Sequence, residues 1–230
     1  MAGIMFEGFS PRTFDFMLNL RFNNNKAWFD EHKDEYLCDF LSPMKALGQE
    51  VFGRISGDYA KHGFIHKVAR IYKDARRVRD GEPYRTNLWF SIERPSEEWT
   101  STPVFWFELS PEEWTYGLGF YRALPMTMAK HRARIDSNPK AFEKLITPLG
   151  KQDEFVLDGP EYARKKTAPT EKTAQWYNLK TFALISNNPI SDELYSSELV
   201  ERLVSGYTFL MPFYDYFITL DADPAPVLSD

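Results

Sequence analysis

The sequence contains a single cysteine, Cys38, among its 230 residues. One thiol excludes an intrachain disulfide and any metal site that needs several cysteines. No apolar run reaches the roughly 18 residues that a membrane-spanning helix requires. The first residues lack the basic head and the apolar stretch of a secretory signal peptide. These absences predict a cytoplasmic protein that does not associate with a membrane.

Motifs that identify a nucleotide site or a nucleophilic enzyme are also missing. There is no P-loop, no Gly-x-Gly-x-x-Gly after a strand pattern and no Gly-x-Ser-x-Gly elbow. The four histidines are scattered, and His62 and His66 have no acidic third ligand nearby, so we expect no metal site. We expect Cys38 to be a packed thiol inside a helix rather than a nucleophile. The sequence specifies no cofactor.

Positive charge is scarce, because 28 Lys and Arg face 33 Asp and Glu for a net charge of −5. This balance argues against non-specific nucleic-acid binding, which depends on a broad basic face. Hydrophobic residues make up 43% of the chain and aromatic residues 16%, enough for a core with rings left for pockets. At this length we predict one domain over residues 1–220 and a frayed tail at 221–230.

The hydrophobic pattern predicts helices at both ends of the chain with a sheet between them. Ser-Pro and Asn signals start helices near residues 11, 25 and 43, and further helices are expected at 125–138, 139–146 and from Ser191 to a break at Pro212. Period-two alternation predicts strands at 68–78, 88–93, 104–109, 114–121 and 179–186. This order is typical of a single α+β domain in which helices flank a mostly antiparallel sheet.

The basic residues are concentrated in one segment, since the chain from Lys67 to Arg85 holds seven Lys or Arg and three Asp or Glu. A cationic island in an acidic chain is typical of anion recognition. On the predicted strand, four side chains would share one face: Arg70, Tyr72, Asp74 and Arg76. A guanidinium on that face offers a planar fork to phosphate or carboxylate. The alternative is a solvated face with an ordinary ladder of ion pairs.

The turn after this strand can extend the site. Pro83 would fix its backbone and Gly81 would allow a positive φ, so that the loop could act as a clamp that carries Arg79, Tyr84 and Arg85. A plain polar turn is the alternative. A second basic cluster on a helix, around Arg132, would contribute only if that side chain turned toward the first.

The Asn23–Asn25 run can supply another part of an anion site. Asn24 or Asn25 should cap the helix that carries Trp28, and we expect that helix to pack near the basic strand. The N–H groups at its first turn would then add donors for an anion. A capped surface turn above a buried Trp28 explains the same pattern.

Several of these segments resemble the DUF2461 family of uncharacterised proteins. The likeness rests on Phe9, Leu20, Asn23–Lys26, Trp28-Phe29, Arg70–Arg76, Asp80 and Pro83–Asn87, with later matches at Gly117, Gly119, Arg132, Ile135 and Lys180–Phe182. It implies a single α+β domain and supplies neither a reaction nor a cofactor. Arg77 replaces a family Phe, Gly81-Glu82 departs from the family's turn, and Thr167–Pro169 stands where the family has Asp-His-Pro. A histidine that relatives used in catalysis would therefore be absent here.

The sequence thus predicts a binding protein or enzyme for an anionic small molecule that carries phosphate or carboxylate. The predicted ligand-binding residues are Asn24, Asn25, Trp28, Arg70, Tyr72, Asp74, Arg76, Arg79, Tyr84, Arg85, Asn87, Arg132 and Lys180. Asp74 and Tyr84 are the catalytic candidates, although flanking arginines favour the ionised form of Asp74 and weaken it as a base. The alternatives are RNA or single-stranded DNA binding through the same surface and protein interaction through the acidic part from Asn187 onward. The oligomeric state is not predicted.

Overall fold

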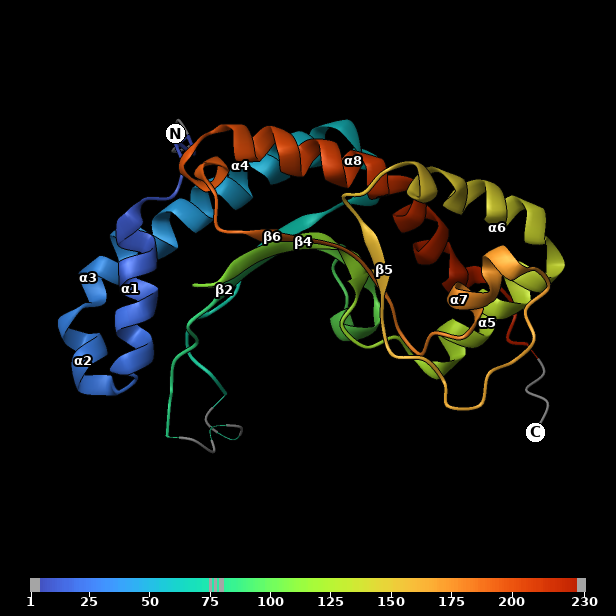
Figure 1. Ribbon diagram of the computed structural model, residues 1–230, viewed down its shortest axis with the longest axis horizontal. Coiled ribbons are helices and arrows are strands. Elements are labelled where there is room, and N and C mark those ends of the chain that lie inside the picture. Colours follow the sequence, from blue (N-terminus) through green and yellow to red (C-terminus); the bar gives the residue numbers. More distant parts are fainter. Residues whose placement is uncertain (1–4, 75, 77, 79–80, 227–230) are drawn as a thin grey trace. The chain divides into compact units, whose positions relative to one another are not determined.

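The computed structural model of the protein describes residues 5–74, 76, 78 and 81–226 (Figure 1). These residues pack into two compact units, each assembled from three stretches of chain. The first unit contains the residues up to Arg94, Trp106–Tyr116 and Asn187–Gly206. The second contains Pro95–Phe105, Gly117–Ser186 and the residues from Tyr207 onward.

Within the described residues, six strands form an antiparallel sheet in the order β1-β2-β3-β4-β6-β5. Their bounds are Ile65–Val68 (β1), Leu88–Glu93 (β2), Pro103–Leu109 (β3), Glu113–Phe120 (β4), Val156–Asp158 (β5) and Ala183–Pro189 (β6). Along β3, buried and half-buried side chains alternate, as expected for a strand with one face on the core. The register of β1 on β2 pairs Val68 with Phe90 at the end of the ladder.

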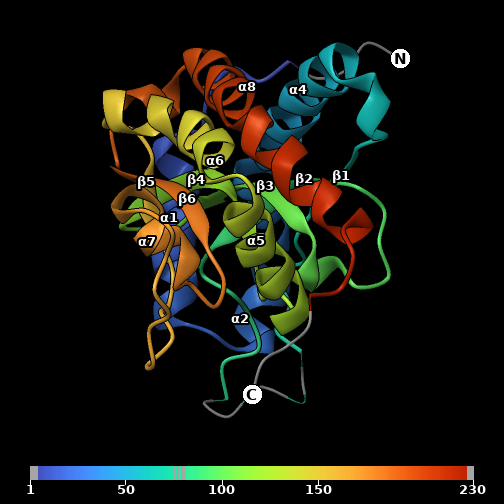
Figure 2. The same cartoon turned by 90° about the vertical axis from the view of Figure 1, so that its right-hand side faces the viewer.

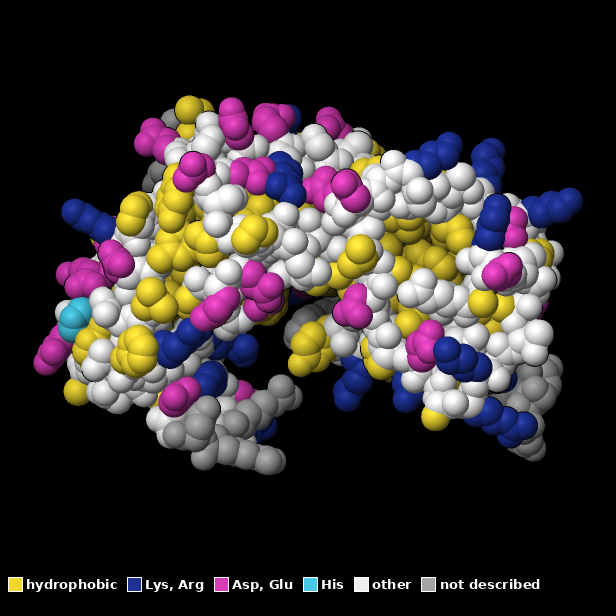
Figure 3. Space-filling view, viewed as in Figure 1, with side chains coloured by type: hydrophobic (Ala, Val, Ile, Leu, Met, Phe, Trp, Pro, Cys, Tyr) yellow, Lys and Arg dark blue, Asp and Glu magenta, His cyan; other side chains and the backbone are white. Residues whose placement is uncertain are grey.

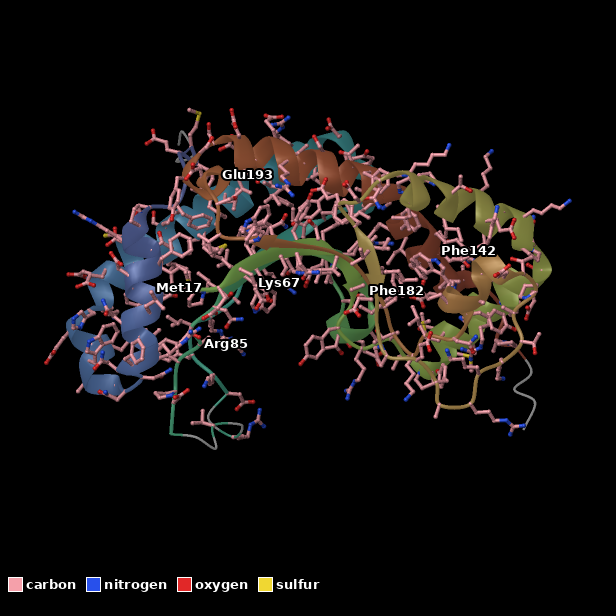
Figure 4. The ribbon with its side chains drawn as sticks, in the orientation of Figure 1. Met17, Lys67, Arg85, Phe142, Phe182 and Glu193 are labelled. Atoms are coloured by element: carbon pink, nitrogen blue, oxygen red, sulfur yellow. The ribbon has the colours of Figure 1, made fainter. Side chains whose placement is uncertain are left out.

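The first unit contains the helices at the start of the chain, one 3₁₀ turn from near its end and the early part of the last helix, α8 (Glu198–Ile218). The helices at the start are α1 (Pro11–Phe22), α2 (Lys26–Glu31), α3 (Lys33–Glu35), the π-helical turn η1 (Tyr36–Leu41), α4 (Ser42–Asp58) and the 3₁₀ turn η2 (Ala60–His62). The later 3₁₀ turn is η7 (Asp192–Tyr195). The hydroxyl of Thr13 accepts a hydrogen bond from Ser10 N at 3.2 Å and satisfies one exposed N–H at the start of α1. Met17 lies on the buried side of α1, toward the strands (Figure 4).

Cys38 lies in η1, and its thiol is free and exposed. The expectation of a packed thiol is therefore wrong. A π-helical turn closes with i→i+5 hydrogen bonds and changes which residues share a helix face. Here the turn keeps Tyr36 and Phe40 buried while Leu37 and Cys38 face solvent.

Aromatic rings form much of the core of the first unit. Phe107 of β3 lies with its ring centroid 6.2 Å from Phe9, 5.6 Å from Phe90 and 5.8 Å from Trp114. Offset and tilted ring pairs of this kind stabilise a core beyond the area that they bury. The high aromatic content of the sequence is therefore used mainly for packing.

The second unit contains the remaining helices. They are η4 (Trp99–Ser101), α5 (Pro125–Ser137), α6 (Pro139–Ile146), η5 (Thr147–Lys151), η6 (Glu171–Thr173), α7 (Ala174–Tyr177), the later part of α8 (Glu198–Ile218) and η8 (Thr219–Ala222). In Figure 2, α5, α6 and α7 face the viewer. Phe142 of α6 points into the interior of this unit, where its ring lies 5.4 Å from Trp176 (Figure 4). The rings of Phe182 and Phe217 pack at 4.1 Å.

The predicted α+β fold with a mostly antiparallel sheet flanked by helices is confirmed, and the arrangement is consistent with a single domain. The expected strands at 88–93, 104–109 and 114–121 match β2, β3 and β4 within one residue. Sequence reasoning missed β5 and placed β6 four residues too early at its start. The range 1–220 for one domain and the frayed tail stay predictions. In that tail, Asp223 bonds to Arg134 at 2.6 Å.

Three expected boundaries are wrong. The last helix does not begin after Ser191, as expected, but at Glu198, because the residues after Ser191 form the separate 3₁₀ turn η7. Pro212 does not break the last helix, because α8 continues to Ile218. Its neighbours Met211 and Phe213 are buried, and burying such a face outweighs the one hydrogen bond that a proline removes. The expected strand 68–78 is not observed among the described residues. The strand β1, from Ile65 to Val68, ends where that strand was to begin, and pairing beyond Val68 continues only as an isolated bridge between Tyr72 and Tyr84. Pro83 limits the pairing there because it has no N–H to donate.

Candidate functional site

The basic segment folds back on itself in the first unit, and we call residues 69–87 the basic hairpin. Its two arms are joined by backbone hydrogen bonds from Ala69 to Trp89, from Arg85 to Ile71 and from Lys73 to Pro83, each 2.8 Å long. Ala75, Arg77, Arg79 and Asp80 lie outside the described residues. The hairpin is therefore a loosely paired extension of β1 and β2 rather than part of the regular ladder.

Helix α2 packs on the basic hairpin, as predicted. Asn25 caps α2 by accepting a hydrogen bond from Trp28 N at 3.1 Å. The side-chain amide of Asn24 donates to Tyr84 O at 2.9 Å and accepts from Tyr84 N at 3.0 Å, so it pairs with the backbone as a neighbouring strand would. Phe29 stacks on Tyr84 with centroids 4.1 Å apart. The polar groups of Asn24 are thus used to hold the hairpin.

The side chains of the hairpin do not converge as predicted. The guanidinium of Arg76 is 90% exposed and bonds to Asp74 at 3.1 Å. Lys73 pairs with Glu82 at 3.5 Å, and Arg70 is exposed. The prediction that Arg70, Tyr72, Asp74 and Arg76 point into one concavity is therefore wrong for Arg76. The guanidinium of Arg76 is already paired with Asp74, two residues earlier, and this pairing holds it at the surface.

The two tyrosines of the bridge differ in environment. Tyr72 is 53% exposed, whereas Tyr84 is 3% exposed and lies under Phe29. Burial, reinforced by the neighbouring Tyr72, raises the pKa of Tyr84, so its phenol stays protonated. This surrounding favours a packing role for Tyr84. Trp28 is half-buried and stacks on His32 at 4.0 Å.

Arg85 and Asn87 lie at the base of the hairpin, where Figure 4 labels Arg85. The Nε atom of Arg85 is buried and has no hydrogen-bond partner in the described part of the chain. Asn87 donates to the carboxylate of Glu108 on β3. Asn87 therefore ties the hairpin base to the neighbouring strand.

A cavity of about 480 Å³ lies within the second unit. It is lined by Leu124, Pro125, Met126, Arg132, Tyr162, Arg164, Lys166, Tyr177 and Asn178. The first four belong to α5 or the residue before it. Tyr177 ends α7 and Asn178 follows it, and the other three belong to the loop of residues 159–173, which we call the cationic loop. Lys and Arg side chains are visible along the lower edge of this unit in Figure 3.

Cations and one aromatic ring form the polar side of this cavity. The guanidinium of Arg132 lies 5.4 Å from the ring centroid of Tyr162, and the ammonium of Lys180 lies 5.8 Å from the same centroid. A cation over a ring is attracted by the ring quadrupole and is held in place. One terminal nitrogen of Arg132 is buried without a hydrogen-bond partner among the described residues. Arg164 and Lys166 are exposed, and neither forms an ion pair within the described chain.

Asn178 fixes the cationic loop against the chain that follows α7. Its amide accepts from Lys166 N at 2.8 Å and donates to Lys166 O at 3.1 Å. Tyr162 N donates to Asn178 O at 2.9 Å, and Lys180 N donates to Pro160 O at 2.8 Å. Both ends of the segment between Tyr162 and Lys166 are therefore anchored, and the side chains between them are held over the cavity wall.

The hydroxyl hydrogen of Tyr177 is used in a hydrogen bond outside the cavity lining. Its hydroxyl donates to Asp136 at 2.9 Å. Burial and this hydrogen bond raise the pKa of Tyr177 to about 12. The phenol therefore stays neutral, and its oxygen retains only acceptor capacity for a ligand.

Of the predicted site residues, the structure brings Arg132 and Lys180 together around Tyr162. Asn24, Tyr72, Asp74, Arg76 and Tyr84 belong to the basic hairpin or contact it. Sequence reasoning missed Tyr162, Arg164, Lys166 and Tyr177. The available signal was the charged, irregular character of residues 159–173, which indicated a loop but not which cavity it lines.

No group of three or more His, Cys, Asp or Glu among the described residues is placed to hold a metal ion. No helix in the same residues combines the length and apolar character needed to cross a membrane.

The family profile described as "Conserved hypothetical protein (DUF2461)" matches residues 12–216 of the 230-residue chain. The match covers most of the sequence, including the basic hairpin and the cavity, so the chain belongs to this family. A search of curated proteins finds no match.

Proposed function

We propose that this DUF2461 protein binds an anionic small molecule, bearing phosphate or carboxylate, in the cavity of the second unit. One observation carries the proposal. Three cations, Arg132, Arg164 and Lys166, line the cavity, and none of its described lining residues is acidic. Cations gathered without counter-charges repel one another, and a bound anion relieves that repulsion.

Arg132 is the side chain best placed to contact the anion. Its stacking on Tyr162 restrains the guanidinium, and its buried terminal nitrogen has an unused N–H. A buried donor without a partner is unfavourable by about 1–3 kcal/mol, and an anionic acceptor would remove that penalty. Lys180, on the same ring, would add to the positive potential.

Calorimetry with a panel of inorganic phosphate, phenyl phosphate, glycerol phosphate and benzoate, at matched ionic strength, tests this proposal. At least one of these anions should bind, and Arg164→Gln combined with Lys166→Gln should weaken it roughly tenfold, about 1.4 kcal/mol for two half-screened charge contacts. Arg12→Gln, which removes an exposed arginine of α1, is the control and should bind as wild type does. Absence of binding by every anion would contradict the proposal.

A second candidate function has separate support at the basic hairpin. Arg70 and Arg76 are exposed there beside the half-exposed ring of Tyr72. Cations beside an exposed ring are the elements with which proteins hold single-stranded nucleic acid. Binding of an oligonucleotide that falls steeply with salt and is lost in Tyr72→Ala would support this function. Salt-insensitive or absent binding would exclude it.

A cytoplasmic location is part of the proposal. It is supported by Cys38, which is a free and exposed thiol, as is common in a reducing compartment.

A further inference from the structure

We infer that the ligand of this cavity is an organic anion with an apolar body, rather than an inorganic or a highly hydroxylated anion. The inference rests on the proposed function and specifies the substrate class of the same site. It comes from the apolar residues of the lining, which are Leu124, Pro125 and Met126.

These three residues begin α5 and present apolar surface to the cavity. Leu124 is 45% exposed and Met126 is 38% exposed, although both are large hydrophobic side chains. Single exposed apolar residues are common on protein surfaces, but adjacent ones that line a cavity indicate contact with an apolar group. Pro125 at the first helical position fixes the backbone of this wall.

The size of the cavity also argues for a ligand larger than its charged group. The volume is about 480 Å³. One water takes up about 30 Å³ of liquid, and a phosphate group is only a few times larger. Cavities for small organic ligands commonly measure about 300–1,000 Å³. An anion at Arg132 would therefore leave most of the cavity for an attached body.

Two of the neutral polar side chains that could recognise a hydroxylated body, Asn178 and Tyr177, are already engaged. Both functions of the Asn178 amide are bonded to Lys166 and Ala174. The Tyr177 hydroxyl donates to Asp136. A body rich in hydroxyl groups would lose its water and find few partners, which weakens binding. The lining of the cavity thus combines cations with apolar side chains and leaves few neutral polar groups for a hydroxylated body.

Calorimetric competition between phenyl phosphate and glycerol phosphate tests the inference, because both carry a phosphate monoester and differ in the polarity of the body. We expect phenyl phosphate to bind at least about tenfold more tightly than glycerol phosphate or inorganic phosphate, since transfer of a ring from water is favourable. Benzoate compared with acetate repeats the test for a carboxylate.

Met126→Gln locates the contact. It should weaken phenyl phosphate by roughly fivefold, through loss of apolar contact, and leave inorganic phosphate unchanged. Phe22→Gln, which changes an exposed ring of α1, is the matched control and should leave both affinities unchanged.

Equal binding of phenyl phosphate and glycerol phosphate would overturn this inference while the proposed function stands. The inference would also be overturned if Met126→Gln weakened the binding of phenyl phosphate and of inorganic phosphate by the same factor. If none of the anions binds, both the inference and the proposed function are overturned.

Discussion

At the scale of single residues, burial decides the chemistry of this protein more than residue type does. Tyr84 and Tyr72 are neighbours across one bridge, yet one is buried and the other half-exposed. Arg132 and Arg76 are both basic, yet Arg132 holds a buried nitrogen beside a cavity and Arg76 extends into solvent. Function therefore follows the surroundings of a side chain, which a residue list does not contain.

His131 should make stability depend on pH. It is fully buried, with Nδ1 3.1 Å from the hydroxyl of Tyr216. Burial, helped by Arg132, lowers its pKa to about 3 from an ordinary 6.5. The unfolded chain therefore binds a proton that the folded chain does not, and the free energy of unfolding should fall as pH drops below 6.5, by about 2 kcal/mol at pH 5.

Urea unfolding of wild type and His131→Gln between pH 7.5 and pH 5 measures this effect. The variant is expected to lose less stability over the window, because it has no imidazole to titrate. Burial also lowers the pKa of His66. Because His66 is present in both proteins, its contribution cancels when their losses of stability are compared. Parallel pH profiles for the two proteins would show that His131 titrates normally.

Gly119 should tolerate no side chain. A Cβ at this position would lie 2.6 Å from Phe182 O and 2.8 Å from the Cα of Ala183. Both are backbone atoms that cannot move without disturbing the strand, so Gly119→Ala should destabilise by more than about 2 kcal/mol. At Gly57, no atom beyond the backbone of its own helix lies within 4 Å of an added Cβ, so Gly57→Ala should instead stabilise the protein by about 0.5–1 kcal/mol. Thermal unfolding distinguishes the two, and a neutral Gly119→Ala would contradict the close approach.

At the scale of elements, local signals predicted the starts of α2 and α6 but neither end of α8. Asn25 caps α2 and Asn138 caps α6 through a bond to Ala141 N at 3.1 Å, and both starts agree with the sequence. Neither end of α8 agrees. Ser191 begins only the 3₁₀ turn η7, and the buried face of α8 continues past Pro212. The starts of α2 and α6 are each marked by one polar side chain, whereas the C-terminal end of α8 is set by the neighbours that the helix meets.

Pro212→Ala should therefore stabilise the protein. Pro212 is exposed inside α8, so the substitution restores an N–H to the helix without removing buried contacts. We expect a gain of about 1–2 kcal/mol, less than the roughly 3 kcal/mol penalty for an interior proline, because alanine also gives the unfolded chain more freedom. Denaturant midpoints measure the change. A loss of stability would mean that the neighbours of α8 require the distortion that the proline imposes.

At the scale of the whole molecule, the two compact units share secondary structure. Four of the five chain boundaries between them fall inside β3, β4, β6 and α8, and the fifth lies between Arg94 and Pro95, just after β2. Unfolding one unit alone would have to break each of these elements in its middle. We therefore predict one cooperative unfolding transition, as expected for the single domain inferred from the sequence.

Differential scanning calorimetry checks this prediction. The calorimetric enthalpy should equal the van't Hoff enthalpy, and the melting curve should have one peak. Phenyl phosphate should shift that whole peak upward, since a ligand that binds only the folded state stabilises everything that unfolds with it. Two peaks, of which only one moves with the ligand, would show that the units unfold independently.

The amino-acid sequence by itself determined the features that depend on neighbours along the chain. These include the α+β class, most of the helix starts, the central strands and the resemblance to the family that the profile match confirms. It also marked Arg132 and Lys180, although it assigned them to a site around the basic hairpin. Period, capping and charge density are local properties, and they can be read without knowing the fold.

Only the tertiary structure decided which residues meet. Arg132 on α5, Tyr162 on the cationic loop and Lys180 after α7 come together around one ring. Asn24 pairs with the backbone of Tyr84, sixty residues away, and so holds the hairpin instead of serving as an anion donor. The physical reason is that pairing and burial are set by contacts between distant segments. A row of charged residues in the sequence has the same pattern whether its partners lie two residues away, as for Arg76, or across a cavity, as for Arg132.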